Sequence, residues 1–158
     1  MLRNMRVQDC MTHSVITVSP LTPLHEAEQT MKEYNIRHLP VVKSDKIVGI
    51  LSSGDVRRAR PSDVTSLSYW ELNYLWGQIT VGNAMSPGVI TVRPYTPVLE
   101  AVRLMVEHRF NSVPVVDVSN HPVGILTEVD VFRVLLQESD EAFQSSESTD
   151  DFPVAALP

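Results

Sequence analysis

The sequence predicts a mixed α/β (α+β) fold. It is built from two copies of one unit, which pack together as a pseudo-twofold pair. Three observations lead to this prediction. The chain repeats itself at a shift of 74 residues, each copy mixes short β-branched runs with helical patterns, and 158 residues are enough for one domain or for two small lobes that share a core. Such a chain can bury a hydrophobic core without disulfides or a structural metal.

The repeat is long and specific. Residues 7–42 match residues 81–116 at 16 of 36 positions, and residues 48–58 match residues 123–133 at 7 of 11 positions, after one extra residue. A chance match of that length is not credible. We therefore divide the chain into repeat 1 (1–60), a helical linker (61–80), repeat 2 (81–141) and an acidic tail (142–158).

Each repeat has the pattern strand, helix, strand, strand, helix. The first strand is the run VITV, and the following helix is expected to begin with Thr22 or Thr96 as N-cap and the next proline in its first position. The middle strands are HLPVV and KIVGIL in repeat 1, and VPVV and PVGIL in repeat 2. The last helix begins near Ser53 or Glu128. One such unit cannot cover both faces of its sheet, so we expect the repeats to pack side by side.

The linker predicts a further helix from about residue 69 to residue 76. Ser68 and Glu71 have the spacing of a capping box, and Gly77 stands where a C-cap belongs. The helix is apolar nearly all round, through Leu67, Trp70, Leu72, Tyr74, Leu75 and Trp76. It either packs on its own repeat or forms a dimer contact, because exposed apolar patches mark interaction sites.

Charge is distributed unevenly along the chain. From Glu138 onward there are six acidic residues and no Lys or Arg, while the preceding residues carry 13 basic groups and the other 13 of the 19 acidic groups. The Ser-rich acidic tail is expected to be disordered from about residue 142, with a partner-binding role for Phe152 to Leu157 as an alternative. The neutral folded part has no basic stripe for nucleic acid. No apolar run of about 18 residues could cross a bilayer and no signal core follows the N-terminus, so we expect a cytoplasmic location.

Motifs for catalysis and metal binding are missing from the sequence. Cys10 is the only cysteine, so no intrachain disulfide can form, and with His13 it supplies two metal ligands without a second pair. No G-x-S-x-G elbow or recognisable cysteine nucleophile is present. The sequence therefore predicts neither an enzyme nor a metal site, and its cysteine usage agrees with a reducing compartment.

Both copies end a buried strand in the same kind of polar turn. VGILSSGDV and VGILTEVDV share a glycine, a hydroxyl and an aspartate, which are Gly49, Ser52 and Asp55 in repeat 1 and Gly124, Thr127 and Asp130 in repeat 2. A P-loop is excluded because Asp55 stands where the lysine belongs and the second copy lacks the second glycine. Helix capping explains the hydroxyl and the acid. The same turn also suits a ribonucleotide, with the helix N-terminus and the hydroxyl on a phosphate and the aspartate on the ribose hydroxyls.

Taken together, these motifs resemble a tandem pair of cystathionine-β-synthase (CBS) domains, also called a Bateman module. The resemblance covers Val7 to about Gln137 and rests on VITV followed by P-x-T-P in both copies, on LPVV and VPVV, and on the two polar turns. The linker TSLSYWELNYLWGQITVGNAM looks like the segment between the repeats of acetoin-utilisation-type CBS proteins. The resemblance implies a stand-alone Bateman module in which each repeat is a three-stranded sheet with two main helices.

The resemblance also implies two clefts for adenine nucleotides, each shared between the repeats. The first, which we name the Asp130 cleft, would use Thr127 and Asp130 with Ile16, Thr17, Arg37 and His38. The second, the Asp55 cleft, would use Ser52 and Asp55 with Ile90, Thr91, Asn111 and Ser112. Arg37 and His38 are cationic or titratable donors, so we expect the Asp130 cleft to bind more phosphates, or to bind more tightly. Arg58 and Arg133 could contribute to either cleft.

The function that the resemblance implies is regulatory. We expect a cytoplasmic, non-enzymatic homodimer that requires no cofactor and binds AMP, ADP or ATP as its regulatory ligand. The ligand would act on an unidentified partner protein by favouring one dimer geometry over another. Two alternatives stay open: a structural or partner-binding scaffold without ligand, and a small enzyme.

Overall fold

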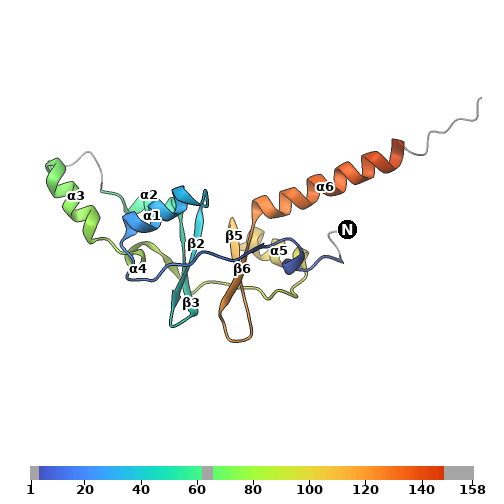
Figure 1. The fold of residues 1–158 in the computed structure, drawn as a ribbon, viewed down its shortest axis with the longest axis horizontal. Helices are drawn as coiled ribbons and strands as arrows, with labels where there is room; N and C mark the ends of the chain where they lie inside the picture. Colours follow the sequence, from blue (N-terminus) through green and yellow to red (C-terminus); the bar gives the residue numbers. More distant parts are fainter. Residues whose placement is uncertain (1–3, 62–65, 148–158) are drawn as a thin grey trace, which may run out of the picture.

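The structure is a computed structural model that describes residues 4–61 and 66–147 (Figure 1). Its helices are η2 (Val7–Asp9, a 3-10 turn), α1 (Leu24–Glu33), α2 (Ser53–Ala59), α3 (Tyr69–Gln78), α4 (Val81–Ala84), α5 (Val98–His108) and α6 (Glu128–Glu147). Its strands are β1 (Thr12–His13), β2 (His38–Lys43), β3 (Lys46–Ser52), β4 (Ser86–Pro87), β5 (Ser112–Val116) and β6 (Pro122–Thr127).

Two three-stranded antiparallel sheets, in the orders β2-β3-β4 and β1-β6-β5, stand side by side at the centre (Figure 1). Helices α1 and α2 contact the first sheet, and α5 and α6 contact the second. The predicted fold class of two similar α/β halves is thus confirmed. Helices α3 and α6 project at opposite ends of the molecule (Figure 1). No helix of the described residues is long and apolar enough to cross a membrane.

Each sheet takes its third strand from the other repeat. Strand β1 of repeat 1 pairs with β6, where Thr12 lies opposite Ile125, and β4 of repeat 2 pairs with β3, where Ser86 lies opposite Ile50. The sequence prediction that VITV is the first strand is wrong, since this run makes only one parallel bridge in each copy, such as Val18 with Val41. A longer parallel pairing would need a backbone N–H from Pro40 in β2 or Pro114 in β5, and proline has no N–H to donate.

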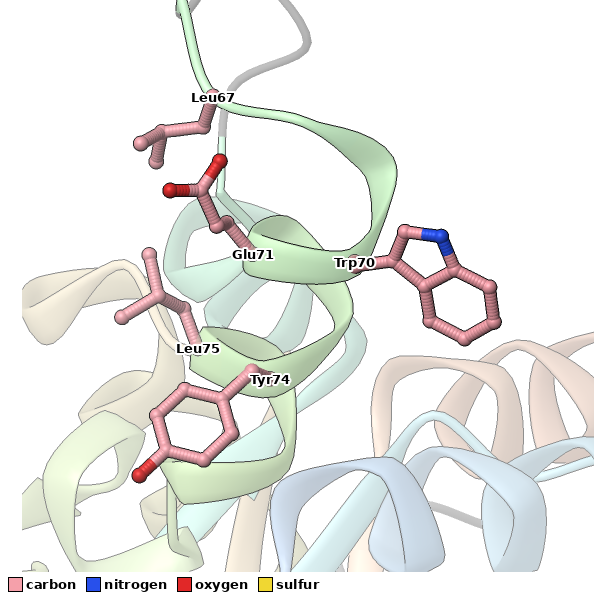
Figure 2. Close-up of a pocket in the computed structure, with 5 residues that line it drawn as sticks. All are labelled: Leu67, Trp70, Glu71, Tyr74 and Leu75. Carbon is pink, nitrogen blue, oxygen red and sulfur yellow. The ribbon is translucent and has the colours of Figure 1, made fainter.

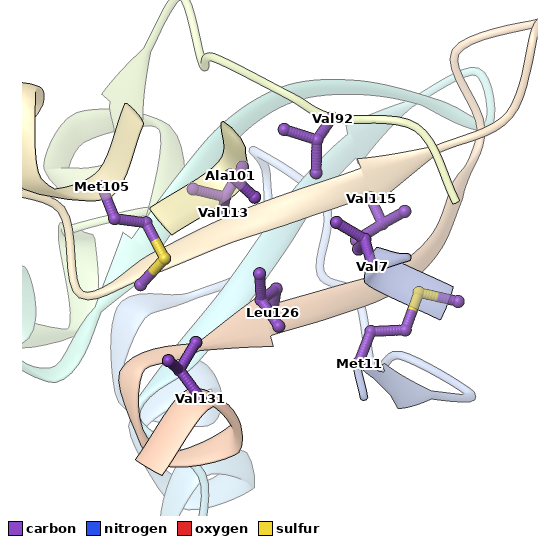
Figure 3. Packing of buried hydrophobic residues seen from close by; sticks show 9 residues of the cluster. All are labelled: Val7, Met11, Val92, Ala101, Met105, Val113, Val115, Leu126 and Val131. Carbon is purple, nitrogen blue, oxygen red and sulfur yellow. The ribbon is translucent and has the colours of Figure 1, made fainter. Parts of the chain in front are cut away.

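The exchange includes the two hydrophobic cores. Val7 and Met11 of repeat 1 pack into the core of repeat 2 (Figure 3), and Val81 packs into the core of repeat 1 with Met85 against it. Equivalent hydrogen bonds hold the exchanged segments, from Val7 N to the Thr96 carbonyl and from Val81 N to the Thr22 carbonyl, both at 2.9 Å. Neither repeat therefore completes its core without a segment of the other.

The exchanged methionines explain the glycine that the two polar turns share. A Cβ at Gly124 would stand 2.5 Å from Met11 Sδ and 3.0 Å from the carbonyl oxygen of Thr12. At Gly49 the corresponding distances are 2.6 Å to Met85 Sδ and 3.0 Å to a backbone oxygen of β4. A side chain at either glycine would therefore require the methionine, and to a smaller extent the exchanged strand, to shift.

Helices α1 and α5 begin one residue later than the sequence predicts. Pro23 and Pro97 occupy the N-cap, so the prediction of threonine caps is wrong. The hydroxyls of Thr22 and Thr96 instead accept hydrogen bonds from backbone N–H groups three residues earlier. Segments from elsewhere in the chain supply the missing caps. Leu24 N donates to the Ile79 carbonyl at 2.9 Å, and Val98 N donates to the Met5 carbonyl at 3.0 Å.

The linker helix is confirmed as α3, with the predicted capping box between Ser68 and Glu71. Gly77, however, lies inside the helix, and the C-cap is Ile79. The Ile79 backbone is extended, with φ −80° and ψ 129°, so this helix end needs no left-handed residue and hence no glycine.

Helix α6 continues through residues 142–147, which the sequence analysis assigns to the disordered tail. No glycine or proline interrupts this stretch, and its Glu, Ala and Gln residues favour a helix. The remaining tail residues, including Phe152 to Leu157, lie outside the described residues.

Candidate functional site

A cleft of about 600 Å³ lies between the two repeats, where the two polar turns face each other. We name it the central cleft. It is lined by residues near the starts of β2 and β5 and by the first turns of α2 and α6. Six of the residues implicated by sequence line it: Arg37, His38, Ser52, Asn111, Thr127 and Asp130.

The polar turn of repeat 2 is a complete capping box. Asp130 Oδ2 accepts hydrogen bonds from Thr127 N at 2.9 Å and from Thr127 Oγ1 at 2.6 Å, and Asp130 N donates to Thr127 Oγ1 at 3.3 Å. The other oxygen, Oδ1, lies 3.4 Å from Arg133 Nη1. The carboxylate is 5% exposed and opens onto the central cleft.

The turn of repeat 1 has the same box with a closer arginine. Asp55 Oδ2 accepts from Ser52 N and Ser52 Oγ, both at 2.7 Å, and Asp55 N donates to Ser52 Oγ at 3.1 Å. Asp55 Oδ1 is held tightly by Arg58. Both oxygens of Asp55 are therefore engaged, as are those of Asp130. The capping interpretation is confirmed for both turns.

The other implicated residues lie around the cleft rather than in it. Ser112 opens β5 opposite Thr127, as His38, which does line the cleft, opens β2 opposite Ser52. Ser112 is 7% exposed and does not line the cleft. Ile16 packs against the core of repeat 1. Six of the residues implicated by sequence do not line the cleft: Ile16, Thr17, Asp55, Ile90, Thr91 and Ser112. The structure thus brings parts of the Asp130 cleft and the Asp55 cleft together on one cavity.

The central cleft is rich in arginine. Arg37, Arg57, Arg58 and Arg133 line it, against the carboxylates of Glu128 and Asp130. Sequence reasoning did not select Arg57 and Glu128, whose counterparts in the other repeat are Phe132 and Ser53; the family resemblance pointed to Arg37 and His38 instead. The only signal for Arg57 was its place beside Arg58 in the motif.

The electrostatics of His38 connect the two walls of the cleft. Burial lowers the pKa of His38 below its usual value, and the positive charge of Arg37 lowers it further. Glu128 of repeat 2 and Asp55 of repeat 1 oppose this shift. Carboxylates of both repeats therefore lie within electrostatic reach of one imidazole, and His38 is neutral at pH 7 in the unliganded protein.

Cys10 and His13 do not form a metal site. Burial, with the nearby charges of Asp130 and Asp9, raises the pKa of the Cys10 thiol to about 11. The thiol donates to the Val7 carbonyl at 3.6 Å, and His13 Nε2 lies 3.2 Å from the Gln8 carbonyl oxygen. Across residues 4–61 and 66–147, no group of three or more His, Cys, Asp or Glu side chains is placed to hold a metal ion.

A second, apolar hollow of about 370 Å³ lies on α3 (Figure 2). It is lined by Leu67, Trp70, Glu71, Tyr74 and Leu75, and Figure 2 shows Trp70 pointing away from the side that carries Tyr74 and Leu75. We name Leu67, Tyr74 and Leu75 the α3 apolar face; Trp70 projects from another side of the helix. Trp70 and Tyr74 are 80% and 68% exposed, while Trp76 packs against the core of repeat 1 and stacks under the Arg60 guanidinium. Helix α3 therefore packs on its own repeat by one side only.

Comparison with known families identifies both repeats. The model of the CBS domain matches residues 7–62 and residues 81–137. Among curated proteins, the chain is 30% identical over 142 residues to an inosine-5'-monophosphate dehydrogenase of Thermoplasma acidophilum, covering 90% of this chain and 26% of the relative. The chain thus spans about a quarter of the length of that relative.

Solved structures with the same fold include paired CBS domains with bound adenosine compounds. The CBS domain pair of protein MJ0100, in complex with 5'-methylthioadenosine and S-adenosyl-L-methionine, has a TM-score of 0.71 and 29% identity over 85% of this chain and 98% of that chain. CBSX2 of Arabidopsis thaliana in complex with AMP has a TM-score of 0.71 and 30% identity, covering 86% and 99%.

The acetoin-type resemblance of the linker also has a structural counterpart. A putative acetoin utilization protein (AcuB) from Vibrio cholerae has a TM-score of 0.71 and 26% identity, covering 89% of this chain and 96% of that chain.

Proposed function

Since this chain belongs to the CBS-domain family and carries two copies of the domain in tandem, we propose that it is a regulatory sensor of adenine nucleotides. The observation that carries the proposal is the arginine-rich central cleft between two aspartate-bearing turns. The AMP complex of CBSX2 supports the ligand class. On this proposal the protein is a cytoplasmic regulator rather than an enzyme, and AMP, ADP or ATP is its ligand.

Asp130 is the residue best placed to hold the ribose. Its Oδ2 serves the helix cap, whereas Oδ1 accepts from Arg133 Nη1 at the longer distance of 3.4 Å. An ionised carboxylate accepts hydrogen bonds only, so a ribose diol is a suitable donor for this oxygen. Arg37 and Thr127, which both line the central cleft, would receive the phosphate. Ile16 and Thr17, which the sequence assigns to the same cleft, do not line it, so a base that reaches them would have to extend beyond the described cavity.

The Asp55 cleft would form the second, weaker position. It would use Ser52 and Asp55 with Ile90, Thr91, Asn111 and Ser112, which offer no cation for a phosphate. Asp55 Oδ1 pairs with Arg58, as Asp130 Oδ1 pairs with Arg133, so the two carboxylates are equivalent in this respect. The support for tighter nucleotide binding at the Asp130 cleft is its own Arg37, while Arg57 and Arg58 line the cavity that both turns share.

Calorimetric titration of the full chain with AMP, ADP and ATP tests the proposal. We expect at least one nucleotide to bind, and Asp130→Ala to weaken binding by about 10- to 100-fold, the equivalent of one charge-assisted hydrogen bond. Asp117→Ala is the matched control, because Asp117 also caps local N–H groups but lies on an exposed turn outside the cleft.

A scaffold without ligand is the alternative that the geometry also supports, because both aspartates already have internal partners. In that case Asp130→Ala would cost about 1 kcal/mol of stability through loss of the cap, and no adenine nucleotide would release heat. Turnover of a nucleotide by the purified protein would instead favour a small enzyme.

We further propose that the chain acts as a homodimer whose contact is the α3 apolar face. Exposed apolar side chains of this size are typical of interaction sites. The nucleotide would regulate a partner protein only if its affinity differed between two dimer geometries. Sedimentation of Tyr74→Ser and Leu75→Ser should show monomers, while Val118→Ser, at an exposed site away from α3, should leave the dimer intact.

A further inference from the structure

Two of the four arginines in the central cleft have no internal partner. Arg58 pairs with Asp55 and Arg133 with Asp130. The side chains of Arg37 and Arg57 make no hydrogen bond or ion pair with any residue in 4–61 or 66–147. A guanidinium that lines a concave site without a carboxylate partner is a ready donor for a phosphate.

Arg57 is held close to another positive charge. A Cβ built on Gly54 would lie 3.4 Å from Arg58 Nη1 and 3.8 Å from Arg57 Nη2, so both guanidiniums stand over the same glycine. Asp55 neutralises only Arg58. Arg37 lies beside this group, because its backbone carbonyl accepts the N–H of Ser53 at 2.9 Å, one residue before Gly54. Arg37 and Arg57 therefore both belong to repeat 1 and lie on adjoining segments that line the cleft.

The charges of the cleft leave none to spare for a second set of phosphates. Its four arginines face three carboxylates: Asp55 is paired with Arg58, Asp130 with Arg133, and Glu128 is held by Asn111 Nδ2 at 3.2 Å. The surplus of one positive charge is already exceeded by one phosphate monoester, which carries about −1.5 to −2 near neutral pH. The volume of about 600 Å³ also falls in the range of a cavity for a single small ligand.

We infer that the Asp130 cleft and the Asp55 cleft exclude each other, so that one chain binds one adenosine phosphate at a time, with its phosphates on Arg37 and Arg57. This inference rests on the proposed function and adds a stoichiometry to it. A second nucleotide would place its phosphates against the first without an unpaired cation to receive them. The two turns would then be alternative positions for one nucleoside around one shared phosphate site.

The test is calorimetry of the full chain with ADP, carried to a large excess, with stoichiometry expressed per chain. We expect one ADP per chain and a second event at least 10-fold weaker. Arg37→Gln and Arg57→Gln should each weaken that same single event by about 10-fold or more. Arg103→Gln, on the exposed surface of α5 and outside the cleft, is the matched control and should bind ADP normally.

Two equal binding events per chain would overturn the inference and leave the proposed function standing. So would an Arg37→Gln variant and an Arg57→Gln variant that each weaken a different event, because the phosphate site would then not be shared. Normal ADP affinity in Arg57→Gln would also overturn it. Absence of heat with AMP, ADP and ATP in the unmodified chain would overturn the proposed function itself, and the inference with it.

Discussion

The wall of the central cleft differs in charge between the two repeats. Repeat 1 carries Arg37, His38 and Arg57 at or near the start of β2 and in α2. The equivalent positions of repeat 2 hold neutral side chains, which are Asn111, Ser112 and Phe132. Two repeats of one fold thus present unequal surfaces to the same cavity.

In the packing of their sheets and in the starts of their last helices, the two repeats are built in nearly the same way. Each places a methionine of the other repeat over a glycine of its own middle strand, and each starts its last helix with the same capping box. These features depend on backbone approach and on a helix N-terminus, which leave little choice of residue. The comparison teaches that packing constrains the shared positions, whereas cleft-facing positions could diverge and make the site asymmetric.

The largest effect should come from Gly124→Ala and Gly49→Ala, which test the symmetry of the scaffold. Each new Cβ would meet a methionine sulfur at 2.5 or 2.6 Å and a backbone oxygen at 3.0 Å. We expect each variant to lose about 2–3 kcal/mol in the free energy of unfolding, as for other overpacked cores. Chemical denaturation measures this loss.

Gly77→Ala is the control for the glycine variants. Gly77 lies in α3 with nothing within 4 Å of its would-be Cβ, so alanine should leave stability unchanged or raise it by up to about 1 kcal/mol. Unequal losses at Gly49 and Gly124 would show that the two cores are not equivalent.

The next effect is on affinity, from exchanging the residues of the two walls. Arg37→Asn gives repeat 1 the residue of repeat 2 and should weaken ADP binding by about 10-fold or more, through loss of a charge-assisted hydrogen bond. Asn111→Arg makes the reverse change and also removes the amide that holds Glu128. It should strengthen ADP binding. Adenosine, which lacks phosphates, should bind both variants and the parent with equal affinity.

A smaller and symmetric effect is expected from the two capping hydroxyls. Ser52→Ala and Thr127→Ala each remove the acceptor for an N–H at a helix start and should cost about 1 kcal/mol in the free energy of unfolding. Ser119→Ala, on an exposed turn, should cost nearly nothing. A loss confined to one repeat would contradict the equivalence of the two boxes.

Sequence reasoning reached the fold through the repeat, because identical residues at a fixed shift require the same local structure twice. It could not find the strand exchange. The hydrophobic pattern of VITV, at residues 15–18, predicts a buried strand. The strand that forms instead is β1, which precedes VITV, and its pairing with β6 depends on which repeat its segment packs against. That choice lies in the packing of Val7 and Met11 across the molecule, which no local pattern encodes.

The candidate site was accessible to sequence only in part. The capping boxes are local and were predicted from their spacing, and both are present. Arg57 and Glu128 were not found by comparing the repeats, because neither has an identical counterpart. Arg37 and His38, which also differ between the repeats, were reached only through the family resemblance.

The smallest effect, and the one most specific to the wall of repeat 1, is the acid sensitivity of His38. Burial lowers the pKa of His38, so the folded protein binds its proton less readily than the unfolded chain does. Stability is therefore complete above the unfolded pKa near 6.5 and falls as the pH drops below it, by at most about 1.4 kcal/mol per pH unit for this one proton. His38→Ser, which copies Ser112, should show a shallower loss between pH 7 and pH 5 in denaturation experiments. Arg37→Asn removes the second cause of the shift and should fall between the two. Equal slopes in all three proteins would show that His38 does not meet the burial and charge of the cleft wall in solution.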